Sequence, residues 1–323
     1  MILSSRKRVA VLRGGPSDEY NVSLKSGGNV LSLLRELSDI YDPIDIFISK
    51  DGEWHREGLV YEPHQALGHV DVVWNALHGS YGEDGQVQRV LEGLKIPFTG
   101  SGALSSAFAM NKVLAKDFYK KHGLLSPRHE LVEKGDNHDQ LIHIFRNYLL
   151  PVIIKPTSGG SSIGIMMAET FKELENAIRS SLNTYKQVLV EEFIKGKEAT
   201  CAVVENFAEE KLYALPPVEI KVKGKSFFDF ESKYSGKTKE ICPGKFTSAE
   251  KAMIEDMSKK AHEILGLRHY SRSDFIITPK GNVYILETNS LPGLTEESLL
   301  PKSLKAINWH PRDFVDHVLK LTI

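Results

Sequence analysis

The chain has 323 residues, of which 41 are Lys or Arg and 42 are Asp or Glu. At about 150 residues per domain, this length predicts two or three domains and excludes a single small one. Hydrophobic residues make up 41% and charged residues 26%, which is the composition of a globular protein and excludes disorder and collagen-like repeats. A formal net charge of −1 gives no global field for capturing nucleic acid or an anionic membrane, so we expect small molecules as partners.

The two cysteines, Cys201 and Cys242, are too few for a disulfide framework or a zinc motif, which favours a reducing compartment. Residues 1–8 lead directly into the strand-like Val9–Leu12, without the apolar stretch of about 7–15 residues that a signal peptide requires. No segment approaches the roughly 18 apolar residues of a membrane span. We therefore expect a cytoplasmic protein.

The first hundred residues alternate between strand-like and helix-like runs, which predicts a parallel α/β domain. These runs are Arg8–Arg13, Val22–Leu37, Ile44–Ser49, Val70–Leu77, Val87–Leu94 and Pro97–Thr99. The turn Gly14–Glu19 follows the first strand and opens a helix, where open α/β sheets bind ligands. Because it lacks the GxGxxG spacing, it does not indicate a dinucleotide cofactor.

A second α/β unit starts near Asn111, and the pattern changes to α+β from Gly196 onward. The second unit comprises a helix to about His122, the strand Val152–Lys155, the helix Phe171–Leu182 and the strand Val188–Glu191. The α+β part comprises the strands Glu198–Val204 and Lys211–Ile220 and a helix over 248–265. The polar stretch 223–245 between them is long for a plain connection, which favours a functional loop.

The helix over 248–265 has its own start signal, because Thr247–Glu250 reads Thr-Ser-Ala-Glu, a capping-box sequence. Apolar residues recur at three- and four-residue steps, which predicts one buried face. This face consists of Ala249, Met253, Met257, Ala261 and Ile264.

The segment Arg272–Asn289 contains two apolar runs around Pro-Lys-Gly-Asn, a pattern typical of a β-hairpin. We expect the turn to be centred on Lys280–Gly281, with Thr278 and Val283 as the closing pair. The facing pairs on one side of the hairpin are then Asp274 with Glu287 and Arg272 with Asn289.

Two carboxylates directly opposed on antiparallel strands are destabilising unless a counter-ion lies between them, because their Cβ atoms are only about 4.5–5.5 Å apart. Asp274, Glu287 and the Asn289 amide oxygen form an all-oxygen set, which suits Mg²⁺ rather than zinc. The alternative is a solvated polar face on an exposed hairpin.

Three further segments are candidates for binding, and each has an ordinary alternative. Lys155–Gly164 is a Gly/Ser loop after a strand that ends in lysine, which fits a phosphate cover but also a flexible surface loop. His78–Gly85 gathers polar residues after an apolar strand, although a polar turn would look the same. Lys233 and Tyr234 in the polar stretch are by themselves equally consistent with solvated side chains.

Taken in order, these segments resemble the D-alanine–D-alanine ligase family of ATP-grasp enzymes over nearly the whole chain. The matching positions are Gly14–Glu19 with Val22–Leu24, His78–Gly79, Gly82–Gly85, Phe98–Gly102, Met110–Lys112, Lys155–Pro156, Gly160–Ser162, Lys233–Tyr234, Arg272, Asp274, Glu287–Asn289 and Pro292–Gly293. The resemblance implies an N-terminal substrate-binding α/β domain (1–110), a central ATP-grasp lobe (111–193) and a C-terminal ATP-grasp lobe (194–323). It also implies peptidoglycan precursor synthesis and a homodimer.

The resemblance implies ATP and two Mg²⁺ ions as cofactors, with Mn²⁺ as a possible substitute. Lys112 and Lys155 would grip the ATP phosphates, and Glu198 would bind the ribose. Adenine would be held, partly by backbone groups, at Glu191, Glu192, Phe193 and Ile194. The two metal ions would be held by Asp274, Glu287 and Asn289.

The same resemblance implies roles toward the two D-alanines. Glu19 would bind the ammonium of the first D-alanine. Hydrogen bonds would link Glu19 to Ser161 and Tyr234. Arg272 and the Gly293 amide would stabilise the oxyanion, and Lys233 would contact the transferred phosphate. His78 would lie near the second D-alanine, whose carboxylate Ser298 would bind.

The chain departs from the family pattern at two places. Thr157–Gly160 reads Thr-Ser-Gly-Gly where many relatives have an Arg-Glu pair before the glycine, and Glu192 replaces a frequent lysine. Two other functions stay open: a ligase that uses D-lactate, D-serine or another amino acid as second substrate, and a nucleotide-binding regulator without catalysis. The presence of Tyr234 favours a dipeptide over an ester product.

Overall fold

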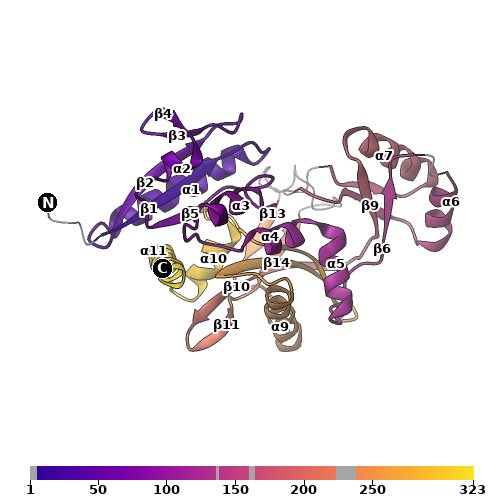
Figure 1. Ribbon diagram of the computed structural model, residues 1–323. Helices are drawn as coiled ribbons and strands as arrows, with labels where there is room; N and C mark the ends of the chain where they lie inside the picture. Colours follow the sequence, from indigo (N-terminus) through magenta and orange to yellow (C-terminus); the bar gives the residue numbers. More distant parts are fainter. Residues whose placement is uncertain (1–5, 136–137, 160–163, 223–237) are drawn as a thin grey trace.

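The computed structural model describes residues 6–135, 138–159, 164–222 and 238–323, and three β-sheets are found in this part of the chain. Figure 1 shows an N-terminal unit, a lobe built around β9, and a C-terminal sheet between them. The lobe around β9 is the central one in the sequence and is called the central lobe below. The predicted combination of α/β and α+β structure is confirmed, and the predicted site residues are distributed over all three units.

The N-terminal sheet has the strand order β4-β3-β2-β1-β5, and its three main strands are parallel, as predicted. Its elements are β1 (Lys7–Gly14), α1 (Tyr20–Glu36), β2 (Tyr41–Ile48), β3 (Trp54–Arg56), β4 (Leu59–Tyr61), α2 (Pro63–Ala66), β5 (Val72–Asn75), α3 (Gln86–Gly93) and α4 (Ala103–Met110). The antiparallel strands β3 and β4 have three residues each, which is too short to show an alternation of polar and apolar residues in the sequence.

The central lobe is a four-stranded antiparallel sheet in the order β6-β9-β7-β8 with a core of its own. Its elements are β6 (His129–Glu133), α6 (His138–Asn147), β7 (Val152–Pro156), β8 (Met166–Ala168), α7 (Phe171–Thr184) and β9 (Gln187–Glu192). The preceding helix α5 (Lys112–Lys121) buries Ala115 and Tyr119 in the core of the C-terminal sheet instead. Helix α5 therefore lies between the two lobes (Figure 1).

The C-terminal sheet is antiparallel, with the order β13-β12-β10-β14-β15 and β11 beside β10. Its elements are β10 (Lys197–Phe207), β11 (Glu210–Ala214), β12 (Val218–Val222), β13 (Thr238–Ile241), α9 (Ser248–Ile264), β14 (Tyr270–Ile277), β15 (Val283–Asn289), α10 (Leu299–Ala306) and α11 (Pro311–Thr322). The single strand predicted over Lys211–Ile220 is wrong. Two prolines, Pro216 and Pro217, lack the N–H donors of a ladder and separate β11 from β12.

A shared hydrophobic core joins the N-terminal unit to the C-terminal sheet. Trp74 of β5 stacks on Tyr270 of β14 with ring centroids 6.3 Å apart, and Phe314 of α11 packs against the same tyrosine. Nearby, the Gly100 N–H donates to Nδ1 of His269 at 3.0 Å. These contacts hold the binding edge of the first sheet against the hairpin β14–β15.

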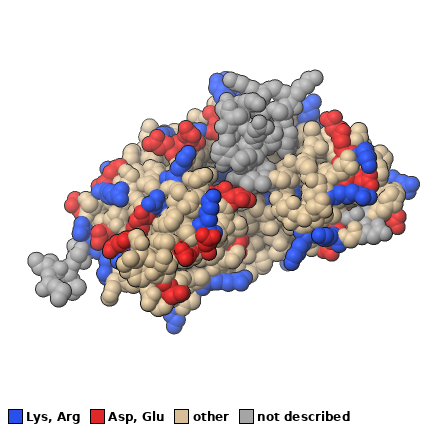
Figure 2. All heavy atoms as spheres, turned by 90° about the horizontal axis from the view of Figure 1, so that it is seen from above, with Lys and Arg blue, Asp and Glu red and all other residues tan. Residues whose placement is uncertain are grey.

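Charged residues are mixed on the surface. On the face shown in Figure 2, Lys and Arg are interspersed with Asp and Glu over the described residues. None of the helices in the described ranges combines the length and apolarity needed to cross a membrane.

Helix α9 begins as predicted, with a complete capping box. The N–H of Glu250 donates to Oγ1 of Thr247 at 3.2 Å, and the N–H of Thr247 donates to the Glu250 carboxylate at 2.8 Å. The predicted buried face is only partly right. Met257 and Ala261 are buried and Ile264 is half-buried, but Ala249 and Met253 are exposed.

The contact between α9 and the sheet explains this difference. The helix packs on the sheet along Ile254, Met257, Ser258 and Ala261, so its buried stripe is rotated toward Ile254 and Ser258. Ser258 is accommodated because its hydroxyl donates to the Ile254 carbonyl at 2.7 Å. The buried stripe thus includes the polar Ser258, whereas the apolar Ala249 and Met253 that the periodicity favours lie outside it.

The capping box predicts a measurable stability difference between neighbouring residues. Thr247→Ala removes the acceptor for the Glu250 N–H and should lower the free energy of unfolding by about 1 kcal/mol. Ser248→Ala, at the next and equally exposed position, removes no cap and should change it by much less. Urea denaturation of both variants checks this, and equal losses would contradict a capping role for Thr247.

Candidate active site

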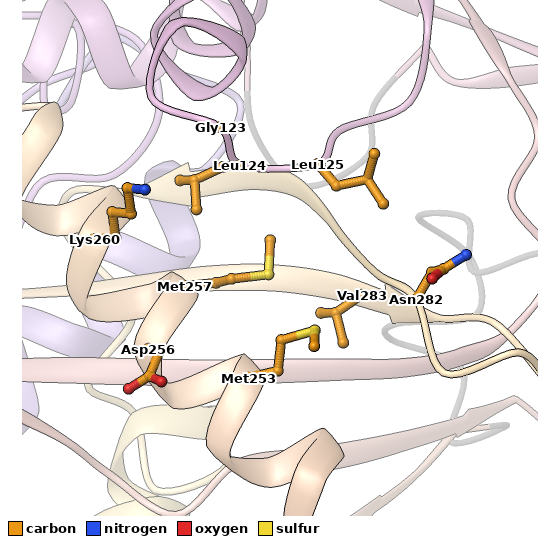
Figure 3. A pocket seen from close by; sticks show the side chains of 9 residues that line it. All are labelled: Gly123, Leu124, Leu125, Met253, Asp256, Met257, Lys260, Asn282 and Val283. Atoms are coloured by element: carbon orange, nitrogen blue, oxygen red, sulfur yellow. The ribbon is translucent and has the colours of Figure 1, made fainter.

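Two hollows in the described part of the chain differ in their lining. One, of about 340 Å³, lies between α9 and the segment after α5 and is lined by Gly123, Leu124, Leu125, Met253, Asp256, Met257, Lys260, Asn282 and Val283. In Figure 3, Met253 and Met257 point toward the leucines and Val283. None of the predicted site residues is among them, and α9 packs on the sheet face opposite to the Asp274 side chain.

The second hollow is a cleft between β9, the sheet strands β10 and β12, and the hairpin β14–β15. It brings together most residues that the sequence predicts for nucleotide and metal. Its lining includes Lys155, Glu191, Glu192, Phe193, Ile194, Glu198, Asp274 and Glu287. Apolar side chains such as Ile153, Ile220 and Leu286 complete it. A mainly apolar cleft with a few convergent charges is the usual form of a small-molecule site.

The hairpin has the predicted register at the site, although the predicted turn is wrong. Asp274 pairs with Glu287 and Arg272 with Asn289, as expected. The closing pairs are instead Ile277 with Val283 and Thr278 with Asn282, and Gly281 adopts a φ of +83° in the shorter loop. Such three-residue loops end on a left-handed glycine.

A β-bulge at Leu286 reconciles the shorter turn with the predicted pairing. Phe275 pairs with Ile285 while Asp274 pairs with Glu287, so Leu286 has no partner on β14. Both Leu286 and Glu287 therefore line the cleft. Bulges commonly redirect a side chain next to a site, and this one places the Glu287 carboxylate opposite Asp274.

The two opposed carboxylates each have a cationic partner. Arg272 donates from Nε to Oδ1 of Asp274 at 3.1 Å, and Nζ of Lys112 lies 3.5 Å from Oε2 of Glu287. Burial alone would lower the pKa of Arg272, but the Asp274 charge raises it. Thr200 on β10 donates from its hydroxyl to Oδ1 of Asp274 at 2.5 Å. This hydroxyl contact was not predicted, because it depends on the pairing of β10 with β14.

The third predicted metal ligand, Asn289, faces the same side but accepts a hydrogen bond from the Leu291 N–H at 2.9 Å. No cluster of three or more His, Cys, Asp or Glu side chains suited to a metal occurs within the described ranges. The predicted ligands are two carboxylates and one amide, and an amide is not among these side chains. Whether they suit a metal ion is therefore judged from the type of their donor atoms. All-oxygen donors around two opposed negative charges suit Mg²⁺ when phosphate and water complete the shell.

Glu191 is the most buried charge of the cleft. Its Oε1 lies 2.9 Å from Nζ of Lys155 and 3.0 Å from Nζ of Lys116, and its side chain is 4% exposed. Burial alone would raise the pKa of Glu191, but the charges of Lys155 and Lys116 lower it. Sequence reasoning missed Lys116. The one available signal was its spacing of four residues from Lys112, which puts both lysines on one helix face.

Glu192, one of the two departures from the family pattern, lies at the rim of the cleft. The backbone N–H and Nε of Arg128 donate to its carboxylate at 2.9 and 3.2 Å. Arg128 is 62% exposed, so the pair is solvated. Glu192 thus has a partner of opposite charge that was not predicted.

The predicted substrate residues of the N-terminal unit lie together at the ends of β1 and β5. Gly79 has a φ of +71°, which favours glycine, and a Cβ atom there would be 2.9 Å from Oε2 of Glu19, so this carboxylate lies directly beside the turn after β5. The neighbouring His78 is buried, and its Nε2 lies 2.8 Å from Oγ of Ser26. Burial alone would lower the pKa of His78, but the Glu83 carboxylate beside its Nδ1 raises it.

The C-terminal loop brings the last two predicted residues next to each other. A Cβ atom on Gly293 would lie 2.9 Å from Oγ of Ser298, and this hydroxyl contacts Thr295 Oγ1 at 2.7 Å. Asn29 of α1 donates to the Leu294 carbonyl at 2.6 Å. The loop that carries Gly293 and Ser298 is therefore attached to the N-terminal unit that carries Glu19 and His78.

Three predicted site residues, Ser161, Lys233 and Tyr234, lie outside the described residues. The same holds for Gly160 in the other departure from the family pattern. Their proposed roles remain predictions.

The chain is similar to one family of proteins along almost its whole length. Family models described as D-ala D-ala ligase N-terminus and D-ala D-ala ligase C-terminus match residues 57–101 and 118–320. A D-alanine–D-alanine ligase from Geobacter sulfurreducens is 37% identical over 97% of this chain and 93% of the relative. Another from Desulfotalea psychrophila is 38% identical over 98% of this chain and 95% of the relative.

Solved structures agree with this similarity. VanG D-Ala:D-Ser ligase from Enterococcus faecalis superposes with a TM-score of 0.87 at 29% identity, over 98% of this chain and all (100%) of that one. The D-alanine–D-alanine ligase from Coxiella burnetii has a TM-score of 0.84 at 23% identity, over 98% of this chain and 94% of that one, and supports the fold. The predicted ATP-grasp architecture is confirmed.

The environment of Glu191 predicts a large stability effect. Glu191→Gln leaves the buried ammonium groups of Lys116 and Lys155 without a counter-ion and should lower the free energy of unfolding by about 3 kcal/mol. Glu192→Gln, one residue further, breaks only a solvated pair and should lower it by at most about 1 kcal/mol. Denaturant titrations of both variants check this. Equal effects would contradict the charge arrangement described for Glu191.

Proposed function

The chain belongs to the D-alanine–D-alanine ligase family, and we propose that it joins two D-alanine molecules to D-alanyl-D-alanine while ATP is converted to ADP and phosphate. The observation that carries the proposal is the cleft in which eight predicted nucleotide and metal residues converge. Identity of 37% over 97% of the chain to a curated D-alanine–D-alanine ligase supports the substrate.

The reaction needs activation because a carboxylate does not react with an amine. The carboxylate of the first D-alanine attacks the γ-phosphorus of ATP, the bond to the bridging oxygen breaks, and ADP leaves. The amine of the second D-alanine then attacks the carbonyl carbon of the acylphosphate. The tetrahedral adduct expels phosphate, and the amine loses its proton to give the peptide bond. Positioning and charge stabilisation are therefore the main tasks of the protein.

The cleft residues are suited to hold ATP. Lys155 and Lys112 supply positive charge for the phosphates. The segment Glu191–Ile194 and Glu198 on β10 line the cleft, where backbone groups of the segment would hold adenine and Glu198 would bind the ribose. Lys112 is held at the entrance of the Gly/Ser loop, because its Nζ donates to the Gly159 carbonyl at 2.8 Å.

The hairpin residues Asp274, Glu287 and Asn289 are suited to hold Mg²⁺ or Mn²⁺. Two ions bound there would offset the negative charge of the phosphates during transfer. Arg272 lies on this face, 3.1 Å from Asp274. Together with the Gly293 amide, it would donate to the oxyanion of the tetrahedral adduct.

The N-terminal unit and the C-terminal loop are suited to hold the amino acids. Glu19 would bind the ammonium of the first D-alanine, in connection with Ser161 and Tyr234, while Lys233 would contact the transferred phosphate. His78 and Ser298 would contact the second D-alanine.

We further propose peptidoglycan precursor synthesis as the role, the cytoplasm as the location, a homodimer as the assembly, and 1–110, 111–193 and 194–323 as the domains. Both described cysteines are free thiols, which is compatible with a reducing compartment. Family membership supports the other three statements.

The substrate test compares ADP formation with D-alanine, L-alanine, and D-alanine mixed with an equal concentration of D-serine or D-lactate. We expect ADP with D-alanine, none with L-alanine, and D-alanyl-D-alanine as the main product by mass spectrometry. D-alanyl-D-serine in excess would assign the chain to D-Ala:D-Ser ligases such as VanG. D-alanyl-D-lactate in excess would assign it to ligases that use D-lactate. Absence of ADP under every condition would favour a regulator.

The position of Arg272 predicts that its substitution lowers the reaction rate without lowering the affinity for the nucleotide. Removing a donor to a developing oxyanion costs about 10²–10³ in rate, and Arg272→Met should show this in D-alanine-dependent phosphate release. Calorimetry should show unchanged binding of a non-hydrolysable ATP analogue. Arg13→Met is the control, because it also breaks an Arg–Asp pair, at 2.7 Å to Asp45, away from the cleft. Lost affinity with a preserved maximal rate would refute the oxyanion role.

A further inference from the structure

Lys116 is a buried charge that the proposed reaction does not use. Its side chain is 0% exposed, and it does not line the cleft. Its Nζ lies 3.0 Å from Oε1 of Glu191 and donates to the Pro127 carbonyl at 3.5 Å. Burial lowers the pKa of Lys116 to about 8, against the opposing effect of the Glu191 charge. A lysine so completely buried is rare unless it is paired, so the Glu191 carboxylate decides its role.

That carboxylate is shared with a cleft residue. Oε1 of Glu191 also lies 2.9 Å from Nζ of Lys155, and both Glu191 and Lys155 line the cleft. The three groups together carry one net positive charge. Because the ammonium groups of Lys116 and Lys155 share the single negative charge of Glu191, this charge neutralises Lys155 only in part. Lys155 therefore keeps positive charge toward the cleft. Without Lys116, Glu191 and Lys155 would form a neutral pair.

Helix α5, which carries Lys116, contacts both β9 and β15 and so fixes these strands relative to each other. Three side chains of one face of α5 contact the strands that border the cleft. Lys112 reaches Glu287 at 3.5 Å, Lys116 reaches Glu191, and the Tyr119 hydroxyl donates to Oγ1 of Thr288 at 2.8 Å. Strand β9 of the central lobe and strand β15 of the hairpin are thus held by the same helix face.

We propose that Lys116 is a positioning residue for nucleotide binding, which holds the Glu191 carboxylate from behind and leaves Lys155 with positive charge for the ATP phosphates. The inference rests on the proposed function, since it takes ATP as the nucleotide. Lys116 contacts no ligand and acts only through Glu191.

The test measures binding of adenylyl imidodiphosphate by calorimetry, followed by steady-state kinetics. Lys116→Met keeps the volume and removes the charge. We expect its dissociation constant for the nucleotide and its KM for ATP to rise about tenfold, because a phosphate loses a charge-assisted contact. The KM for D-alanine and kcat should change by less than about twofold. Lys120→Met, an exposed lysine of the same helix, is the control and should bind as the wild type does.

A second substitution separates charge from structure. In the double variant Lys116→Met, Glu191→Gln, Lys155 is again uncompensated, so nucleotide affinity should recover relative to Lys116→Met alone. Lys116→Gln, which keeps a donor but no charge, should weaken binding as Lys116→Met does and serves if the methionine variant does not fold. Unchanged affinity in a folded Lys116 variant, or no recovery in the double variant, would overturn the inference. Absence of nucleotide binding by the wild type would instead refute the proposed function.

Discussion

The opposition of Asp274 and Glu287 across the hairpin is the constraint on which the arrangement of the cleft depends. Two carboxylates at this separation repel each other, and the strands can keep them paired only if positive charge is nearby. The chain supplies that charge from Arg272 on the same strand and from Lys112 on α5. Both negative charges are thus balanced by side chains of the chain itself.

Helix α5 connects this constraint to the rest of the cleft. Its buried face packs in the core of the C-terminal sheet, while Lys116 pairs with Glu191 on the central lobe. The shared core around Trp74 and Tyr270 similarly fixes the N-terminal unit on the same sheet. The candidate nucleotide, metal and amino-acid regions come from three sheets, and buried contacts rather than the surface set their relative positions.

The sequence predicted which residues gather in the cleft better than it predicted the contacts that hold them there. The pairing of Asp274 with Glu287 follows from counting along the hairpin, yet it holds only because the bulge at Leu286 compensates for a turn one residue shorter than expected. No local sequence pattern predicts this bulge. Lys116 would be taken for a solvated side chain, since pairing across 75 residues of chain is invisible to periodicity. The exposed Met253 shows the converse error, because tertiary packing chose another stripe of α9.

The most direct test of the central claim is a Mn²⁺ titration followed by electron paramagnetic resonance in the presence of adenylyl imidodiphosphate. Wild-type protein should bind Mn²⁺ in a nucleotide-dependent manner. Glu287→Gln should bind the nucleotide but retain less Mn²⁺, whereas Asp256→Asn, which alters a carboxylate of the hollow in Figure 3, should titrate as the wild type does. Identical Mn²⁺ titrations of Glu287→Gln and wild type would contradict the account of the opposed carboxylates as a cation site.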